Sequence, residues 1–454
     1  MKKIYTINMV EGPVFGKILL FSLPLAATGI LQLLFNAADM IVVGKFAGGN
    51  SLAAVGATAS FISLLTGTFL GISIGVNIIV ARYLGCRDEK SVNTAIHTAI
   101  ALSILLGIGL LILGLFLSVP VLKLMGTPEE VIGLAALYLR IYFLGVPANL
   151  IYNFGAAILR SFGDTRKPLF FLMFSGAVNI GLNLLLVIVF HLDVAGVAIG
   201  TVSAQFISCV LVIGSLTRVK GTGNLKLREL RINWRMAKDM IAVGLPAGLQ
   251  TAFFNISNLV IQSTVNSFGT AVMAAASAAG NLETFVSLAM DAVFQASVTF
   301  TSQNIGAGKK ERIPLIFRDS MIVVILLGIS IGGGTCLFGP QLLSIYISPG
   351  DAAYRAVIHY GMLRLIYVSG FQFLCGMMNV VCGMIRGLGH AWLPMIIAVV
   401  GICVLRIVWI MTIFQEHRTL DVLYLAFPVS WIVTGIAEYI CYRRMWKKIS
   451  PGKK

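Results

Sequence analysis

The chain alternates long apolar runs with short polar connections along its whole length. Each run reaches the roughly 20 residues that a helix needs to cross the hydrocarbon core of a bilayer. Lipid offers no partners to backbone polar groups, so runs of this kind are expected to be helical. The twelve runs lie near residues 18–43, 53–80, 92–119, 131–158, 168–190, 194–216, 238–265, 271–303, 314–340, 356–384, 393–414 and 421–442. The pattern predicts an all-α integral membrane protein with twelve transmembrane helices.

The second six runs repeat the first six at a spacing of about 222 residues. Pro24 matches Pro246, and LRSFGDTRKP at 159–168 matches IRGLGHAWLP at 385–394. Internal repeats are common in transporters. We therefore expect two pseudo-symmetric six-helix bundles, facing each other across a central cavity. The N-terminal lobe, the C-terminal lobe and a basic cytoplasmic linker between them are expected at 1–220, 221–454 and about 218–238.

Composition agrees with a lipid environment. Of the 454 residues, 58% are apolar and only 11% are charged, whereas soluble domains carry roughly 25% charged residues. A chain of water-soluble domains is therefore excluded.

The positive charges of the chain are concentrated in one of its two sets of loops. The net charge is +16 and the pI is near 9.7. With both termini placed inside, 27 of the 34 lysines and arginines fall in cytoplasmic segments and 4 fall in outer ones. Lysine and arginine concentrate at the cytoplasmic ends of spans. We expect a multi-pass protein of the plasma (inner) membrane with both termini cytoplasmic, and no nucleic-acid partner.

Cysteine and histidine give no sign of a metal centre. The seven cysteines and five histidines show neither paired spacing nor the spacing of metal ligands. We expect no disulfide framework, no metal site and no cofactor.

The first span carries a polar stripe that ends in a carboxylate. At 100° per residue, Gln32, Asn36 and Asp39 fall on one face of the helix together with Thr28. An ionised carboxylate in lipid needs a proton or a cation beside it, and amide and hydroxyl oxygens are the ligands that an alkali cation prefers. We interpret Asp39 and Asn36 as parts of a coupling-cation site. The alternative is a structural hydrogen bond to a neighbouring helix.

Other spans carry polar residues at steps of about one helical turn. Asn179 with Asn183 and Thr201 with Gln205 lie four residues apart in the fifth and sixth spans. Ionisable or amide side chains inside spans commonly mark a substrate pathway. The candidates for a substrate cavity are Gln32, Asn255, Asn258, Gln262, Glu283, Asp291 and Gln295.

Two acids in the eighth span have two possible roles. Glu283 and Asp291 would attract cationic substrates, or each would pair with an arginine inside a span. Arg140, Arg364 and Arg406 are the available partners. We predict that Asp291 is the main reader of substrate charge. Glu438, near the cytoplasmic end of the last span, is expected on a solvated face.

At these residues the sequence resembles the MATE family, the multidrug and toxic compound extrusion transporters. The matching motifs are NAADMIVVGKFAGGNSLAAVGA after residue 35, LRSFGDTRKP after residue 158 and QNIGAGK after residue 302. The resemblance implies an antiporter that exports drugs or toxic organic compounds, often cationic, in exchange for H⁺ or Na⁺ by alternating access. It also implies that the partners are the lipid bilayer and small organic substrates, and that the protein is a functional monomer.

The resemblance also assigns a cation site. The helix 1 carboxylate of the family falls on Asp39, and its partners fall on Asn179, Asn183 and Thr201. Proton-coupled relatives often have an aspartate at the position of Asn183. Sodium-coupled relatives carry acids in helices 7 and 10, where this chain has Phe254 or Asn255 and Cys375. The expected ion site is therefore the one in the N-terminal lobe.

Two other functions are compatible with a chain of twelve spans. A lipid-linked oligosaccharide flippase of the same superfamily tends to have more spans and a strongly cationic cavity. A membrane-embedded enzyme needs a catalytic constellation such as H-E-x-x-H or paired aspartates, and the sequence has none. We expect no enzymatic activity.

Overall fold

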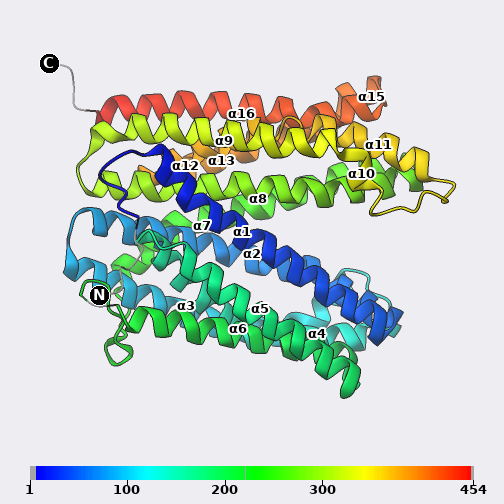
Figure 1. The fold of residues 1–454 in the computed structure, drawn as a ribbon, viewed down its shortest axis with the longest axis horizontal. Helices are drawn as coiled ribbons and strands as arrows, with labels where there is room; N and C mark the ends of the chain where they lie inside the picture. The colour runs from blue at the N-terminus through cyan, green and yellow to red at the C-terminus, as the bar shows by residue number, and fades with distance from the viewer. Residues whose placement is uncertain (1–6, 220, 451–454) are drawn as a thin grey trace. The chain divides into compact units, whose positions relative to one another are not determined.

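A computed structural model describes residues 7–219 and 221–450. Its described part is helical and contains no strand, and twelve helical segments are long and apolar enough to cross a membrane (Figure 1). The predicted fold class and number of spans are thereby confirmed. The spans of the first half comprise α1 (Phe15–Val42) with η1 (Val43–Ala47), α2 (Gly49–Gly85), α3 (Glu89–Leu124), α4 (Glu129–Ser161), α5 (Arg166–Leu184) with η2 (Leu185–Val189), and α6 (Asp193–Thr217).

The second half has the same order with more interruptions. Its elements are α7 (Trp234–Asn266), α8 (Thr270–Gly306), α9 (Ile313–Leu337), α10 (Gly339–Leu343), α11 (Tyr354–Tyr367), α12 (Gln372–Gly387), α13 (Trp392–Ala398), η5 (Val399–Val404), α14 (Leu405–Met411), α15 (Ile413–Glu416) and α16 (Leu420–Ile449). Short 3₁₀ turns, η3 (Leu227–Glu229) and η4 (Lys310–Arg312), lie in the connections before α7 and α9.

The chain forms two compact units that exchange two segments. Unit 1 includes residues 27–248, and unit 2 includes residues 8–26 and 249–454. The divisions fall two residues after Pro24 in α1 and two residues after Pro246 in α7. Proline removes one backbone hydrogen bond and crowds the preceding turn. This division differs from the expected lobes, 1–220 and 221–454, because the first parts of α1 and α7 pack with the opposite half.

Unit 1 is built around α4, which packs against α2, α3 and α6. The first part of α7 lies against α2 with almost no space between the backbones. A Cβ atom on Gly71 would lie 2.2 Å from the amide nitrogen of Gly248, and one on Gly75 would lie 2.0 Å from the carbonyl oxygen of Met240. Glycines of α2 thus allow α7 to join this unit.

The predicted basic linker is held on α3 by polar side chains. Asn93 Oδ1 accepts the backbone N–H of Gly223 (2.8 Å), and His97 Nε2 accepts that of Lys226 (3.1 Å). These hydrogen bonds hold the linker on α3, whereas the sequence predicted only that the linker is basic.

Unit 2 is built around α8 and α12, with α9, α11 and α16 against them. Contacts along the segment 8–26 join it to this unit. Asn304 Nδ2 donates to the carbonyl of Met9 (3.0 Å), Ser22 Oγ donates to the carbonyl of Ala292 (3.4 Å), and the ring of Phe21 meets that of Phe300 edge-on at 5.7 Å. The polar bonds and the ring contact together fix the start of α1 on α8.

Several predicted spans are not regular helices. The expected continuous run at 356–384 is broken between Tyr367 and Gln372, where the chain leaves α11 and begins α12. A Cβ atom on Gly370 in this break would lie 2.5 Å from the carbonyl oxygen of Ile366, so the turn depends on glycine. Single π-helical segments also end α1 and α5 and interrupt the eleventh span at η5. Hydropathy detects the apolar run and not the break, because both parts are equally apolar.

The orientation of the helices in the membrane stays a prediction from the loop charges, and native Cys86 offers a test. Cys86 is exposed at the end of α2, beside Arg82 and Arg87, and should be cytoplasmic. A thiol reagent that cannot cross the membrane should label Cys86 only after cells are permeabilised. It should label Ser348→Cys, made in a Cys86→Ser background, in intact cells. The opposite pattern would reverse the orientation.

Candidate functional site

Asp39 lies at the centre of a three-helix polar cluster in unit 1. Asn183 Nδ2 of α5 donates to Asp39 Oδ1 at 2.5 Å, and Thr201 Oγ1 of α6 donates to Asp39 Oδ2 at 3.4 Å. With its amide oriented to satisfy both neighbours, Asn179 Nδ2 donates to Asp39 Oδ1 at 2.9 Å and its Oδ1 accepts the backbone N–H of Thr201 at 3.2 Å. We name these four residues the Asp39 cluster. The structure thus brings together Asp39, Asn179, Asn183 and Thr201 as the sequence predicts.

Close contacts among α1, α5 and α6 place the cluster. A Cβ atom on Gly200 would lie 2.0 Å from Asn183 Oδ1, and one on Gly176 would lie 1.9 Å from the ring of Phe35. Asn183 is fully buried, and its Oδ1 has no hydrogen-bond partner within the described ranges 7–219 and 221–450. Asp39 is half-buried. The carboxylate is therefore held by donors from inside the unit.

The π-helical turns lie next to the cluster. η1 begins four residues after Asp39, and η2 begins two residues after Asn183. π-helical turns inside α-helices are frequent at functional sites, because they shift the register of the residues that follow. α1, which carries Asp39, and α5, which carries Asn183, therefore both change from α-helical to π-helical geometry just after the cluster.

Two other residues, Asn36 and Tyr138, were candidates for the surroundings of Asp39 or lie close to it. Asn36, predicted as a member of the cation site, is exposed and makes no hydrogen bond within the described part of the chain. Tyr138 of α4, which sequence reasoning missed, is buried and lies in electrostatic range of Asp39. The sequence does not show that this tyrosine lies near Asp39, because only the packing of α4 places it there.

Glu283 is not a free anion. Arg364 of α11 donates through Nε to Oε1 (2.7 Å) and through Nη2 to Oε2 (2.9 Å) of Glu283. The guanidinium carbon also lies 5.7 Å from the centroid of the Tyr424 ring. Glu283 thus forms the pair with an intramembrane arginine that was the alternative expected for it, and its place in a substrate cavity stays a prediction. Asp291 has no ion pair among the described residues and is exposed on α8.

The other predicted cavity residues lie on exposed or half-buried faces. Gln32 and Asn258 are exposed, and Asn255 and Gln295 are half-buried. Gln262 Nε2 donates to Asn266 Oδ1 at 2.9 Å. Their role in substrate binding stays a prediction.

Two charged residues of unit 2 are buried more deeply than their sequence positions suggest. Arg406 is 4% exposed and stacks its guanidinium carbon 4.2 Å from the centroid of the Phe427 ring, with Nε donating to Ser430 Oγ at 3.0 Å. Glu438 is 0% exposed, so the prediction of a solvated face is wrong. The side of α16 that carries Glu438 faces α12 and not the solvent.

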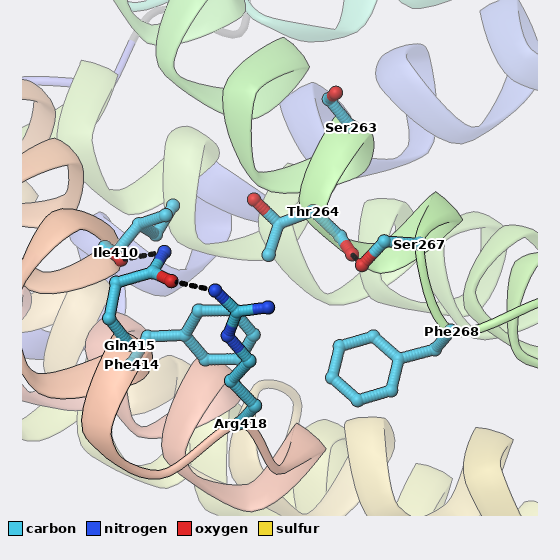
Figure 2. Close-up of a pocket in the computed structure, with 8 residues that line it drawn as sticks. All are labelled: Ser263, Thr264, Ser267, Phe268, Ile410, Phe414, Gln415 and Arg418. Atoms are coloured by element: carbon cyan, nitrogen blue, oxygen red, sulfur yellow. Dashed lines mark hydrogen bonds between the residues drawn. The ribbon is translucent and has the colours of Figure 1, made fainter.

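A pocket of about 410 Å³ lies in unit 2, where α7 ends, beside α14 and α15 (Figure 2). Arg418 donates to Gln415 Oε1, and Gln415 Nε2 donates to the carbonyl of Ile410 (3.1 Å). The rings of Phe268 and Phe414 lie 6.0 Å apart. The lining also includes Ser263, Thr264 and Ser267. None of the cavity residues predicted from the sequence lines this pocket.

The fold and its polar clusters define a class: a polytopic membrane protein of two repeated six-span halves with a carboxylate held inside a span. The family model described as MatE matches residues 24–185 and 246–412, one match in each half. The chain belongs to the MATE family of multidrug efflux transporters, so the resemblance drawn from its motifs is confirmed.

Individual relatives agree with this assignment. The chain is 28% identical to the probable multidrug resistance protein YpnP of Bacillus subtilis over 97% of each chain. It is 26% identical to the probable multidrug resistance protein YoeA of the same species, over 94% of this chain and 93% of the relative. A solved structure described as the outward-facing conformation of a multidrug resistance MATE family transporter superposes with a TM-score of 0.89 at 20% identity, covering 99% of each chain. This likeness shows the shared fold.

The contact between Gly200 and Asn183 generates a stability prediction. In Gly200→Ala the new methyl group should displace the Asn183 amide from Asp39 and destabilise the protein by about 1–3 kcal/mol, as overpacking does. Gly214→Ala is the matched control, because it lies on the same helix with nothing within 4 Å of its Cβ position. Thermal unfolding in detergent should show a lower midpoint for Gly200→Ala and an equal or higher one for Gly214→Ala. Equal midpoints would mean that α5 and α6 separate without cost.

Proposed function

We propose that this protein is a secondary active antiporter that exports organic compounds in exchange for H⁺ or Na⁺ by alternating access. The observation that carries the proposal is the Asp39 cluster, a carboxylate inside a span to which two amides and a hydroxyl donate. Ionisable groups at such positions commonly bind the coupling ion of a transporter.

The chemistry of the cluster fits a group that gains and loses a cation. Three donors stabilise the ionised carboxylate while no cation is present. A bound proton removes the negative charge, and a bound Na⁺ shares it with oxygen atoms. Asn183 Oδ1, which is buried without a hydrogen-bond partner among the described residues, and Thr201 Oγ1 are neutral oxygens of the cluster that would serve this purpose. In both cases the bonds that join α1 to α5 and α6 change, which gives the ion a differential affinity for two conformations.

We propose that substrate charge is read by Asp291 of α8. Its carboxylate is exposed and has no ion pair in the described part of the chain, whereas Glu283, two turns earlier on the same helix, is neutralised by Arg364. An unpaired anion attracts a lipophilic cation with little screening where water is scarce. The names of the relatives above, which refer to multidrug resistance, are consistent with substrates of this kind.

The proposal includes the cellular setting expected from the sequence. The protein would act in the plasma (inner) membrane with both termini cytoplasmic, as a monomer and without a cofactor. Its partners would be lipid, the coupling ion and small organic substrates.

Asp39→Asn should abolish gradient-driven export while leaving abundance near normal. The amide keeps the shape and part of the hydrogen bonding but carries neither a titratable proton nor a charge for Na⁺. Export of a fluorescent cationic dye from vesicles, driven separately by a proton gradient and by a sodium gradient, measures the effect and identifies the ion.

Asp193→Asn is the matched control, because Asp193 is exposed at the start of α6 and its backbone φ of 44° suits asparagine. The control should export at the rate of the unmodified protein. Full export by a normally abundant Asp39→Asn protein would reduce the Asp39 cluster to a structural contact.

Asp291→Asn and Glu283→Gln should fail in different ways. Asp291→Asn should lower export of a monocationic dye about tenfold, which corresponds to about 1.4 kcal/mol, and should spare a neutral substrate. Glu283→Gln should leave Arg364 without its partner and destabilise the protein by up to about 3–5 kcal/mol, so folded yield should fall. Dye specificity and monomer yield are measured on both variants. Equal losses for both substrates with poor yield of Asp291→Asn would make Asp291 structural.

A further inference from the structure

Glu438 of α16 is a buried acid that the Asp39 mechanism does not use. Its side chain is 0% exposed, and neither carboxylate oxygen has a hydrogen-bond partner among the described residues. Thr434, one turn earlier on the same face, is also fully buried, and in the described part of the chain its Oγ1 has no hydrogen-bond partner. Buried carboxylates are normally hydrogen-bonded or ion-paired, because burying an isolated negative charge costs several kcal/mol or more. An acid without donors is stable in such a place when it carries a proton.

A buried arginine lies near Glu438 and is engaged elsewhere. Arg386 of α12 is 3% exposed, and its charge acts on Glu438. The two residues do not form an ion pair within 4.0 Å in this part of the structure. Arg386 Nη2 instead donates to Gln250 Oε1 of α7, and its guanidinium carbon lies 5.6 Å from the centroid of the Phe294 ring. Its Nε has no hydrogen-bond partner among the residues that the structure describes.

The other titratable groups near Glu438 are thiols and the phenol groups of tyrosines. Cys382 and Cys375 of α12 lie in electrostatic range of the carboxyl group. On the side of α9, the neighbours of this part of α16 are aromatic, with the ring of Phe317 stacked on those of Tyr439 and Tyr442. Among the charged groups of the elements packed around Glu438, Arg386 is therefore the one that acts as its counter-ion.

We propose that Glu438 is a proton-binding site of unit 2, separate from Asp39. Arg386 couples the protonation state of Glu438 to α7 by changing its hydrogen-bond partner. With the proton on Glu438, the pair carries the single positive charge of the guanidinium, and Arg386 binds Gln250. When the proton leaves the carboxyl oxygen for water, the carboxylate attracts the guanidinium, which stays charged throughout. Arg386 then exchanges Gln250 for Glu438, and the pair becomes neutral overall.

The change of hydrogen-bond partner affects α7 because of where Gln250 lies. Gln250 is the second residue of α7 that belongs to unit 2, because the division between the units falls after Gly248. Release of Gln250 therefore frees the first turn of α7 within unit 2.

The neighbouring charge argues against a metal-ion site. The guanidinium of Arg386 would repel a second positive charge, and Glu438 and Thr434 together offer two carboxyl oxygens and one hydroxyl. A metal ion such as Na⁺ would need more oxygen ligands than these. The ligand is therefore the proton.

Infrared spectroscopy of the purified full-length protein, titrated from mildly acidic to mildly alkaline buffer, tests the site directly. The test uses an Asp39→Asn background, so that failure of the Asp39 proposal does not affect it. A carboxylic acid C=O band should disappear as the buffer becomes alkaline, and this band should be missing in Asp39→Asn/Glu438→Gln. Glu416→Gln, which removes an exposed acid at the end of α15, is the control and should retain the band. A band that never changes with pH, or that survives Glu438→Gln, overturns the proposal.

A second measurement does not require a Glu438 variant to fold. The rate of backbone hydrogen exchange in α7 around Gln250, corrected for the intrinsic pH dependence of exchange, should rise several-fold in alkaline buffer. The corrected exchange rate of α2 is the reference and should not rise in this way. Arg386→Gln should remove this acceleration and should make the carboxylic acid band persist into more alkaline buffer, because the carboxylate loses its counter-ion. Exchange around Gln250 that follows α2 at every pH would show that Arg386 does not change partners.

Discussion

The structure depends on one constraint: inside a span, each polar group needs a partner from the protein, because hydrocarbon supplies none. The constraint explains the helical architecture of the described residues and the pairing of Arg364 with Glu283. It also explains Arg406, which lies over the ring of Phe427 and donates to Ser430. A guanidinium on an aromatic face gains a favourable interaction without any acid. Arg364, Glu283 and Arg406 are satisfied in these ways, so the functional proposals rest on the other charges in the spans.

Three acids in the spans have no ion-pair partner among the described residues, and each differs from the others in its surroundings. Asp39 is half-buried and held by donors from two helices. Asp291 is exposed and Glu438 is fully buried, and among the described residues Asp291 has no ion pair and neither oxygen of Glu438 has a hydrogen-bond partner. A held anion suits ion binding, an exposed anion suits a cationic ligand, and a buried acid without donors suits a proton. The same functional group thus serves three proposed purposes because its environment differs.

Helix irregularities occur where the chain changes unit or surrounds a polar site. Pro24 and Pro246 precede the two points at which a helix passes from one unit to the other. π-helical turns follow Asp39 and Asn183 within one turn or little more. Such irregularities cost backbone hydrogen bonds. The loss is tolerated because neighbouring helices and side chains satisfy the freed groups.

The sequence alone determined the number of spans, the internal repeat and the family, and it predicted Asp39 as a candidate ion-binding residue. These properties are local or periodic: apolar runs, matched motifs and one carboxylate on a polar helix face are visible in a short window of sequence. The tertiary structure alone decided which acids are paired, which helix breaks and which half of the chain each part of α1 and α7 joins. The reason is distance along the chain. Asn183 lies 144 residues from Asp39, and Arg364 lies 81 residues from Glu283, so only the packing of helices determines whether a carboxylate meets a donor, an arginine or no partner.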